Sequence, residues 1–313
     1  MTRFKFVAGT CVALFVFVCT ALPVRAQATS NNMTAKEKQN LQFVLDWWRE
    51  VIAGRHVELT PKYQAEDYIQ HNINIATGRD AFAKFFGRFG APINPIPAKL
   101  PNPPTVQFAK GDFVVLIWER EGKDPADPSK TYKYNTYDML RLQNGKVQEH
   151  WDYALKTPNT PRGGAPDGID YDKVKFDLSA QEKKNVDITN VEMRDILQYG
   201  HVELAPKVMA PIYIQHNPNV PTGRDGFVDF FSKVRKPEPL KPEWKNKPTL
   251  IVPSGQYVFY LVKRENKDPD NPTMTYPAYW FDLLRVENGM IQEHWDAATK
   301  NPPAPAAGRG ATN

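Results

Sequence analysis

Two side chains that could exchange protons stand two residues apart near the middle of the chain. In the segment Gln148-Glu149-His150-Trp151-Asp152, an imidazole and a carboxylate alternate with other residues. Side chains of a strand alternate between its two faces, so a strand here would place His150 and Asp152 on the same face. On a concave apolar face, burial would raise the pKa of the carboxyl group toward the working pH. The pattern predicts general acid–base chemistry, and a structural His150–Asp152 pair that closes the sheet is the alternative interpretation.

The same segment occurs twice, because the sequence repeats itself. Gln292–Asp296 repeats Gln148–Asp152 at a shift of 144, and Tyr213–Asn217 repeats Tyr68–Asn72 at a shift of 145. From residue 37 to residue 90, 24 of 54 positions are identical to those 145 residues later. This repeat predicts two tandem copies of one domain. The six histidines all fall at matched positions, as His56/His201, His71/His216 and His150/His294.

The list of candidate acid–base residues depends on this repeat and on the register of one hairpin. A two-residue turn at Asn144-Gly145 would pair the strand of His150 with the preceding strand and set Asp138 opposite Trp151. Asp138 joins the group only if a β-bulge shifts this register by one residue. For His71, a histidine that bonds to loop backbone is the alternative. We expect catalytic roles for Asp138, His71, His150 and Asp152 in the first copy and for Asp282, His216, His294 and Asp296 in the second.

Aromatic side chains are expected to form a substrate pocket around these groups. Trp48, Phe82, Phe86 and Trp118 would supply a low dielectric and a slot for a flat molecule. Two histidines and a carboxylate could hold a metal ion, but the chain has no tight metal-ligand motif, so we expect none. A dinucleotide fingerprint, a phosphate loop, a nucleophile elbow and a paired-histidine zinc helix are also missing from the sequence. We therefore expect no cofactor, and a small apolar or carbonyl-containing ligand as the partner.

Helices precede strands within each copy. Thr34-Ala35-Lys36-Glu37 is a capping box, and apolar residues from Leu41 to Ile52 follow at helical spacing. A helical turn is expected around 57–66, a second helix from Gly78, and strands over 105–109, 113–120, 131–142 and 146–155. This order predicts an α+β fold with helices on one face of a curved antiparallel sheet. The first helix of the second copy is more polar, so we expect that copy to depend on the first for support.

The ends of the chain and its charge indicate an exported protein of two domains. Within 313 residues, Arg3 and Lys5 precede an apolar run from Phe6 to Leu22, as in a secretory signal peptide; an uncleaved anchor is the alternative. Cleavage after Ala26 would remove both cysteines. The formal net charge of +5 includes three basic leader residues, so nucleic acid and membrane lipid are not expected partners. We expect a signal peptide over 1–26, domains over 34–157 and 179–300, a linker over 158–178, a disordered tail over 301–313, and a periplasmic or secreted location.

The repeated motifs resemble a known family. Tyr-Ile-Gln-His-Asn, Gly-Arg-Asp with Phe-Phe, and the segment 138–152 ending in Glu-His-Trp-Asp are similar to SnoaL-like polyketide cyclases, also labelled predicted aldol-condensation enzymes, of the nuclear transport factor two-like superfamily. The resemblance implies two cone-shaped, cystatin-like α+β barrels, each with about three helices, that pair through their sheets as an internal pseudo-dimer. It also implies an acid–base role for Asp152 and Asp296. Those cyclases are cytoplasmic single-domain proteins, so the substrate is not carried over.

These observations support two hypotheses of function. The first is a cofactor-independent lyase, cyclase or isomerase that acts on a small carbonyl compound. Asp152, with Asp296, would remove a proton alpha to the carbonyl, while His71 or His150 donates a hydrogen bond to the developing enolate. The second is a non-catalytic exported module that binds a small molecule or a partner. A cone filled by its own side chains, or an arginine bridged to Asp152, would favour the second.

Overall fold

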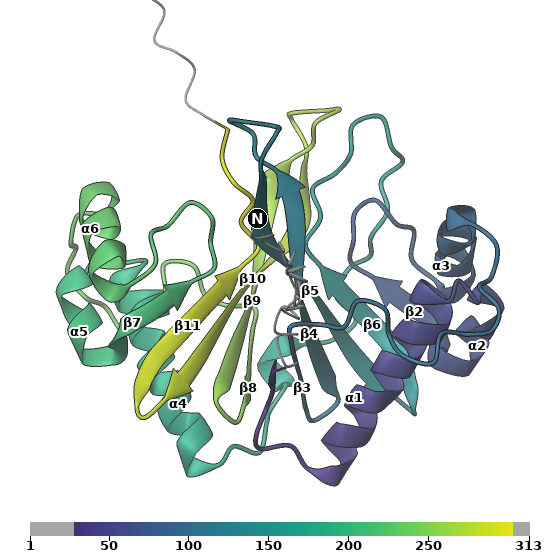
Figure 1. The fold of residues 1–313 in the computed structure, drawn as a ribbon, viewed down its shortest axis with the longest axis horizontal. Coiled ribbons are helices and arrows are strands. Elements are labelled where there is room, and N and C mark those ends of the chain that lie inside the picture. The colour runs from purple at the N-terminus through teal and green to yellow at the C-terminus, as the bar shows by residue number, and fades with distance from the viewer. Residues whose placement is uncertain (1–27, 303–313) are drawn as a thin grey trace, which may run out of the picture.

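Two sheets form the centre of the molecule, and the helices of each half lie on the outer side of their own sheet (Figure 1). The computed structural model describes residues 28–302 of the chain. The expected signal peptide over 1–26 and nearly all of the expected tail over 301–313 lie outside the described residues. Within the described part of the chain, no helix combines the length and apolar character that crossing a membrane requires.

Helix α1 (Ala35–Trp47) begins where its capping box predicts. The Thr34 hydroxyl accepts from the Glu37 N–H at 3.2 Å, and the Glu37 carboxylate accepts from the Thr34 N–H at 2.7 Å. The helix buries Leu41, Val44 and Trp47, and the chain continues as a π-helical turn over Trp48–Ala53. A 3-10 turn (Val57–Leu59) and α2 (Thr60–Tyr63) follow, and α3 (Arg79–Phe86) is extended by a 3-10 turn over Gly87–Phe89.

The first sheet is open and has the strand order β1-β3-β4-β5-β6-β2. Its strands are β1 (Ala28–Thr29), β2 (Gln64–Gln70), β3 (Val106–Lys110), β4 (Phe113–Lys123), β5 (Thr131–Gln143) and β6 (Lys146–Asp152). Strands β3 to β6 form the expected antiparallel meander, but β1 and β2 add to it in parallel with β3 and β6. The expected turn over 57–66 was therefore too long, because β2 starts at Gln64. The α+β class is confirmed, and the sheet does not close into a barrel.

A β-bulge in β6 sets the register of the last hairpin. Gln143 pairs with Lys146 across the predicted turn, in which Asn144 and Gly145 both have positive φ. Between Arg141 and Leu142 the register shifts, so that one extra residue of β6, Gln148, has no partner. Beyond the bulge Asp138 pairs with Asp152, where an unbroken register would have set it opposite Trp151.

The second half repeats the element order of the first. The helices are α4 (Ala180–Asn190), α5 (Ala205–Val208) and α6 (Arg224–Val234), with a π-helical turn at Val191–Ile196 and 3-10 turns at Tyr171–Lys173 and Val202–Leu204. The strands are β7 (Met209–Gln215), β8 (Leu250–Ser254), β9 (Tyr257–Lys267), β10 (Thr275–Glu287) and β11 (Met290–Asp296), in the order β7-β11-β10-β9-β8. As its sequence predicts, α4 is polar: the residues it buries are Glu182, Asn185 and Thr189.

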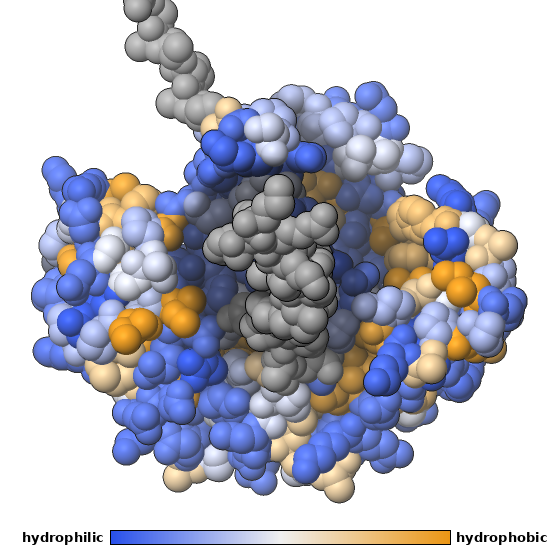
Figure 2. Space-filling model, viewed as in Figure 1, coloured by the Kyte–Doolittle hydropathy of each residue, from blue (hydrophilic) through white to orange (hydrophobic). Residues whose placement is uncertain are grey.

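The two sheets contact each other through one apolar cluster. Phe108 of the first sheet stacks on Tyr257 of the second with ring centroids 5.8 Å apart. Tyr137 donates a hydrogen bond to the backbone carbonyl of Tyr279 at 2.8 Å. Both halves therefore bury one sheet face against each other and cover the other face with helices. Figure 2 shows a largely hydrophilic surface on the viewed side, with apolar residues gathered mainly over the outer helices.

Candidate active site

Asp138, His150 and Asp152 lie together on the helix-covered face of the first sheet. Asp138 belongs to β5 and the other two residues to β6, and the bulged register places Asp138 beside Asp152. One ligand-type atom from each of the three side chains lies within 4.8 Å of the others. The rings of Trp47 and Trp48 are nearly perpendicular to the imidazole of His150, and their centroids lie 6.0 and 6.3 Å from the imidazole centroid. The bulge is thus what brings Asp138 into the group.

Hydrogen bonds around His150 determine which of its ring nitrogens carries a proton. The side-chain oxygen of Gln70 accepts from the Asn72 N–H at 3.0 Å, so the Gln70 amide nitrogen faces the Tyr68 hydroxyl at 3.1 Å. Tyr68 accepts this hydrogen bond and donates its own proton to Nδ1 of His150 at 2.9 Å. The opposite nitrogen, Nε2, donates to Oδ1 of Asp138 at 3.0 Å. The imidazole therefore carries its proton on Nε2.

Asp138 has a donor on each of its oxygens. Oδ1 accepts from His150, and Oδ2 accepts from the indole N–H of Trp118 at 2.6 Å. Trp118 in turn packs against Trp48 with ring centroids 4.9 Å apart. With a donor on each oxygen, Asp138 fixes the orientation of the His150 and Trp118 rings. Asp138 therefore fits a positioning role, and proton removal falls to the other carboxylate.

Asp152 is the carboxylate best suited to accept a proton. Its Oδ1 accepts from the Asn72 side chain at 2.8 Å, and the residue is half-buried at the pocket wall. Burial raises the pKa of Asp152 to about 6; the charge of Asp138 adds to the rise, while His150 and the Asn72 hydrogen bond oppose it. A carboxyl group with this pKa is ionised near neutral pH and is more basic than an exposed one.

A pocket of about 300 Å³ opens beside these groups. Trp48 and Phe86 line it, as the sequence predicts. Phe82 lies behind Phe86, fully buried, with ring centroids 4.3 Å apart, and Trp118 reaches the site through its bond to Asp138. The pocket is lined by Trp48, Ile52, Gln70, Asn72, Ile75, Phe86, Arg120, Tyr134, Thr136, Tyr137, Asp138, His150, Asp152 and Tyr153.

The structure places His71 and His216 away from both trios. His71 bonds through Nε2 to Glu149 at 2.8 Å and stacks on Trp151 with centroids 4.8 Å apart, on the face of β6 that turns toward the second half. His216 repeats this arrangement with Glu293 at 3.0 Å and Trp295. The reason is strand alternation, because the neighbours of His150 point to the opposite face. The expected hydrogen bond from His71 to an enolate in the pocket has no geometric basis here.

The second half assembles a matching trio from Asp282, His294 and Asp296. Their ligand-type atoms also lie within 4.8 Å of one another, and all three residues are buried. Asn217 donates to Asp296 at 2.7 Å, as Asn72 does to Asp152. Burial raises the pKa of Asp296, as it does for Asp152.

A buried glutamate makes this second trio chemically different. Glu192 stands at the repeat position of Trp47 and is fully buried. Its Oε1 lies 2.8 Å from Nδ1 of His294 and accepts from the Tyr213 hydroxyl at 2.8 Å. Burial lowers the pKa of His294, but the carboxylates of Glu192 and Asp282 outweigh it and hold that pKa well above its usual range.

Comparison with known proteins places the first half in a family. Residues 44–150 match the family model described as the SnoaL-like domain. Residues 44–150 form a SnoaL-like domain. A search of the curated proteins found no match.

Solved structures similar to the chain each cover about two fifths of it. A candidate polyketide cyclase from Bacillus cereus ATCC 10987 is 20% identical over 38% of this chain and 77% of its own, with a TM-score of 0.28. A protein of unknown function with a cystatin-like fold from Xanthomonas campestris is 17% identical, covering 37% and 91%, with a TM-score of 0.27. A candidate ketosteroid isomerase from Kribbella flavida DSM 17836 is 16% identical, covering 39% and 84%, with a TM-score of 0.27.

Several residues of the two sites were not predicted. Tyr68 and Asn72 were visible within the repeated Tyr-Ile-Gln-His-Asn motif, whose histidine drew attention away from its neighbours. Arg120 lines the pocket and recurs as Arg264, a repeat that alignment of the two copies could have revealed. Glu192 could have been found as a charge inside an apolar helix stripe.

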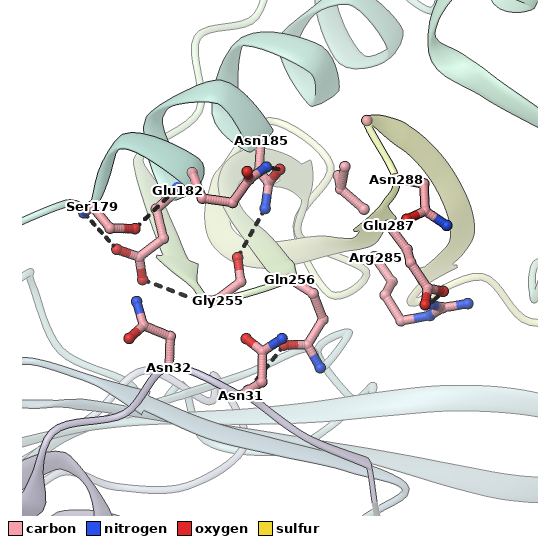
Figure 3. Close-up of a pocket in the computed structure, with 13 residues that line it drawn as sticks. Asn31, Asn32, Ser179, Glu182, Asn185, Gly255, Gln256, Arg285, Glu287 and Asn288 are labelled. Atoms are coloured by element: carbon pink, nitrogen blue, oxygen red, sulfur yellow. Dashed lines mark hydrogen bonds and ion pairs between the residues drawn. The ribbon is translucent and has the colours of Figure 1, made fainter.

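A second, polar pocket of about 490 Å³ is lined by residues of the N-terminal segment, α4 and the β10–β11 hairpin, and contains no residue of either trio. Figure 3 shows its lining, where Glu182 bonds to the Ser179 and Gly255 backbones and Asn185 bonds to Gly255. Glu182 also forms an ion pair with Lys110 of the SnoaL-like domain at 3.0 Å. Its carboxylate is thus occupied by helix capping and by contact between the halves, so we assign this pocket a structural role.

Proposed function

We propose that the SnoaL-like first half is a cofactor-independent cyclase, lyase or isomerase that acts on a small carbonyl compound, with Asp152 as the general base. The observation that carries this proposal is the difference in environment between two adjacent carboxyl groups. Asp138 has a donor on each oxygen, whereas Asp152 faces the pocket with a pKa raised to about 6. Environments that separate two carboxyl groups in this way are typical of acid–base sites.

The reaction begins with Asp152 taking a proton from the carbon next to the substrate carbonyl. The C–H electron pair moves into the enolate, and negative charge develops on the carbonyl oxygen. Arg120 is the one lysine or arginine among the lining residues, so it is the cation available to stabilise that oxygen. The enolate then takes the proton back at another carbon. Alternatively it attacks a second carbonyl in the same molecule, forming a C–C bond, and the new alkoxide takes the proton from Asp152. Asp138 and His150 act as positioning residues.

The dimensions of the pocket limit the substrate. A volume of about 300 Å³ is at the lower end for ligand pockets, so a compound of one or two rings is the largest that fits. The aromatic rings of Trp48 and Phe86 and the carboxylate of Asp152, all in the pocket wall, favour a flat, largely apolar molecule that carries a carbonyl group.

Ligand binding without turnover is the alternative. In the described residues Asp152 bonds to Asn72 and forms no ion pair with an arginine within 4 Å, and the pocket is not filled by side chains. Neither of the two features that would favour a pure binding module is present in that region. The aromatic lining by itself suits either function, so the experiment must separate binding from proton transfer.

The test measures proton exchange directly. Small cyclic ketones and β-diketones are incubated with the protein in D₂O, and loss of the alpha-proton signal is followed by NMR. We expect exchange with the natural protein, a loss of at least 100-fold in Asp152→Asn, and no change in the matched variant Asp296→Asn. Ligand-induced shifts without exchange would favour the binding module, and equal exchange in Asp152→Asn would refute the assignment of the base.

We also propose, from the leader sequence, that the protein is exported to the periplasm or beyond. Its two halves would act as an internal pseudo-dimer, supported by the shared apolar cluster between the sheets. N-terminal sequencing of the mature protein from cell fractions tests the first point, since export with cleavage predicts a start at Gln27.

A further inference from the structure

We propose that the second half binds a divalent first-row transition metal ion, with Asp282, Asp296 and Nε2 of His294 as ligands and Glu192 as the carboxylate partner of the histidine. The inference is independent of the proposed reaction, because it concerns a different trio on a different sheet.

The donor atoms suit such an ion in type and spacing. Two carboxylates and one imidazole lie with one ligand-type atom each within 4.8 Å of the others, and Nε2 of His294 is 3.1 Å from Oδ1 of Asp282. Ligands at 2.0–2.2 Å from a tetrahedral metal stand about 3.4 Å apart, so small side-chain movements complete the site. A mixed set of imidazole and carboxylate ligands favours zinc, manganese or iron over magnesium and calcium.

The hydrogen bonds on the far side of the imidazole distinguish this trio from the first one. A carboxylate oxygen only accepts, so Oε1 of Glu192 takes a proton from Nδ1 of His294 at 2.8 Å. A metal-binding histidine typically donates its other N–H to a carboxylate in this way. In the ion-free protein Nε2 of His294 donates to Oδ1 of Asp282, and this proton leaves when the ion binds. In the first half, Nδ1 of His150 faces the Tyr68 hydroxyl at 2.9 Å, so a neutral group stands where Glu192 offers a carboxylate.

Glu192 also places an unpartnered carboxyl oxygen in the protein interior. Its side chain is inaccessible to solvent, and its Oε2 has no hydrogen-bond partner among the described residues. Three carboxyl groups thus surround one imidazole, and a buried polar oxygen without a partner is costly. Arg264, whose charge also acts on Asp282 and Asp296, is exposed and stacks on Trp280 at 4.0 Å. A divalent cation inside the trio would place positive charge directly between the carboxyl groups, closer than the exposed Arg264 side chain.

The repeat locates the differences between the two sites: Glu192 replaces Trp47, and Val262 replaces Trp118, whose indole N–H donates to Asp138 in the first half. Position 192 corresponds to Trp47, whose ring packs against His150 and Phe82 with centroids 6.0 and 5.6 Å away. The surrounding tyrosine, asparagine and trio are the same in both halves. The first half therefore serves as an internal control, with equal ligand spacing but without the carboxylate partner.

The experiment is metal titration of the full-length protein after treatment with EDTA and dialysis. Zn²⁺ and Mn²⁺ are each titrated by calorimetry, and bound metal is counted by mass spectrometry after gel filtration. We expect one ion per chain. The double variant Asp282→Asn/Asp296→Asn should weaken binding by at least 100-fold, and Glu192→Gln by 10- to 100-fold, the range seen when such partners are removed. Asp138→Asn and Asp152→Asn should leave the stoichiometry at one.

Three results would overturn the proposal: less than a tenth of an equivalent bound at 100 µM metal, unchanged binding in the double variant, or binding lost in the first-half variants. Circular dichroism establishes that each variant is folded. If the double variant fails to fold, Glu192→Gln decides, because glutamine keeps the size of the side chain and removes only its charge. Since proton exchange depends on Asp152, failure of this proposal and failure of the proposed function produce different patterns.

Discussion

Glu192 occupies in the second half the place that Trp47 occupies in the first. Both side chains are fully buried, and both contact the histidine of their trio. Trp47 directly precedes the π-helical turn Trp48–Ala53, and Glu192 lies within the turn Val191–Ile196. Trp47 offers that histidine a ring at 6.0 Å between centroids, whereas Glu192 offers a carboxylate oxygen at 2.8 Å. This substitution changes the hydrogen bonding at Nδ1 of the histidine, while the trio, the tyrosine and the asparagine around it repeat. The two histidines therefore lie in different electrostatic environments.

Replacing Asp152 by asparagine should stabilise the protein at neutral pH. The unfolded chain releases this carboxyl proton near its ordinary pKa of 3.8 and the folded protein near 6, so the folded state holds more protons between these values. Stability therefore falls as the pH rises through this window, by up to about 3 kcal/mol for a shift of this size. Asp152→Asn avoids that loss, so its unfolding free energy should exceed the natural protein's by 1–3 kcal/mol at about pH 7.5 and match it near pH 4.

Urea denaturation at several pH values measures this difference. Asp80→Asn is the matched control, because the Asp80 side chain is 99% exposed and its neutralisation should change stability by less than about 0.5 kcal/mol. A constant difference between Asp152→Asn and the natural protein from pH 4 to 8 would show that Asp152 titrates at its ordinary pKa.

Proton exchange in the pocket should depend on the same carboxyl group. Only the ionised form of Asp152 can accept a proton, so the exchange rate should rise with pH, reach half its maximum near pH 6, and level off above about pH 7.5. The rate of alpha-proton exchange in D₂O buffers, measured well below saturation, gives this profile. A midpoint near 4 would indicate an exposed carboxylate, and would remove the reason for choosing Asp152 over other acids.

Trp118→Phe should destabilise the first half and leave the second unaffected. The substitution keeps the aromatic packing against Trp48 but removes the indole N–H that bonds to Asp138 at 2.6 Å. A buried carboxylate oxygen that loses its donor costs about 1–3 kcal/mol. Trp280→Phe is the control, because that ring contacts Arg264 and its loss of area should cost less than about 1 kcal/mol. Equal unfolding free energies for the two variants would contradict the role given to the Trp118–Asp138 bond.

The elements of the fold were largely predictable, because long apolar strands and capped helices carry their own signals. The hairpin turn at Asn144-Gly145 and the capping box at Thr34 are local patterns that depend on few neighbours. β2 was missed because it is an edge strand with mixed burial and no regular apolar alternation. The bulge at Gln148 was not predictable either, since an extra residue in one strand is decided by packing between strands and not by the strand's own sequence.

The site was predictable in its residue types but not in its grouping. His150 and Asp152 follow from strand alternation, and their repeat in the second half gave further support. Asp138 joins this pair only because of the bulge at Gln148, and the sequence did not show that a bulge occurs there. His71 was placed in the pocket because β2, the strand that ends just before it, was not recognised; the end of that strand directs the histidine to Glu149 instead.

Lys110→Met should destabilise the whole chain, because Lys110 connects the halves through a buried ion pair. Its Nζ lies 3.0 and 3.1 Å from the two carboxylate oxygens of Glu182, and the two side chains are 8% and 1% exposed. Removing the lysine leaves a buried carboxylate that still accepts from the Gly255 and Ser179 N–H groups. Because these two bonds remain, we expect a loss of about 2–4 kcal/mol, toward the lower end of the range for broken buried pairs.

The control for this variant is Lys36→Met, which removes an ion pair with Asp112 of similar length, 2.7 Å, but with side chains 70% and 52% exposed. An exposed pair contributes less than about 1 kcal/mol, so the two methionine variants should differ by at least 1 kcal/mol in thermal or urea unfolding. The number of steps in the unfolding transition provides a second test. If the polar helix α4 depends on the first half for support, Lys110→Met should split unfolding into two steps, with the α4-containing half unfolding first. A single transition, shifted no more than that of Lys36→Met, would mean that the apolar cluster between the sheets holds the halves together without help from this ion pair.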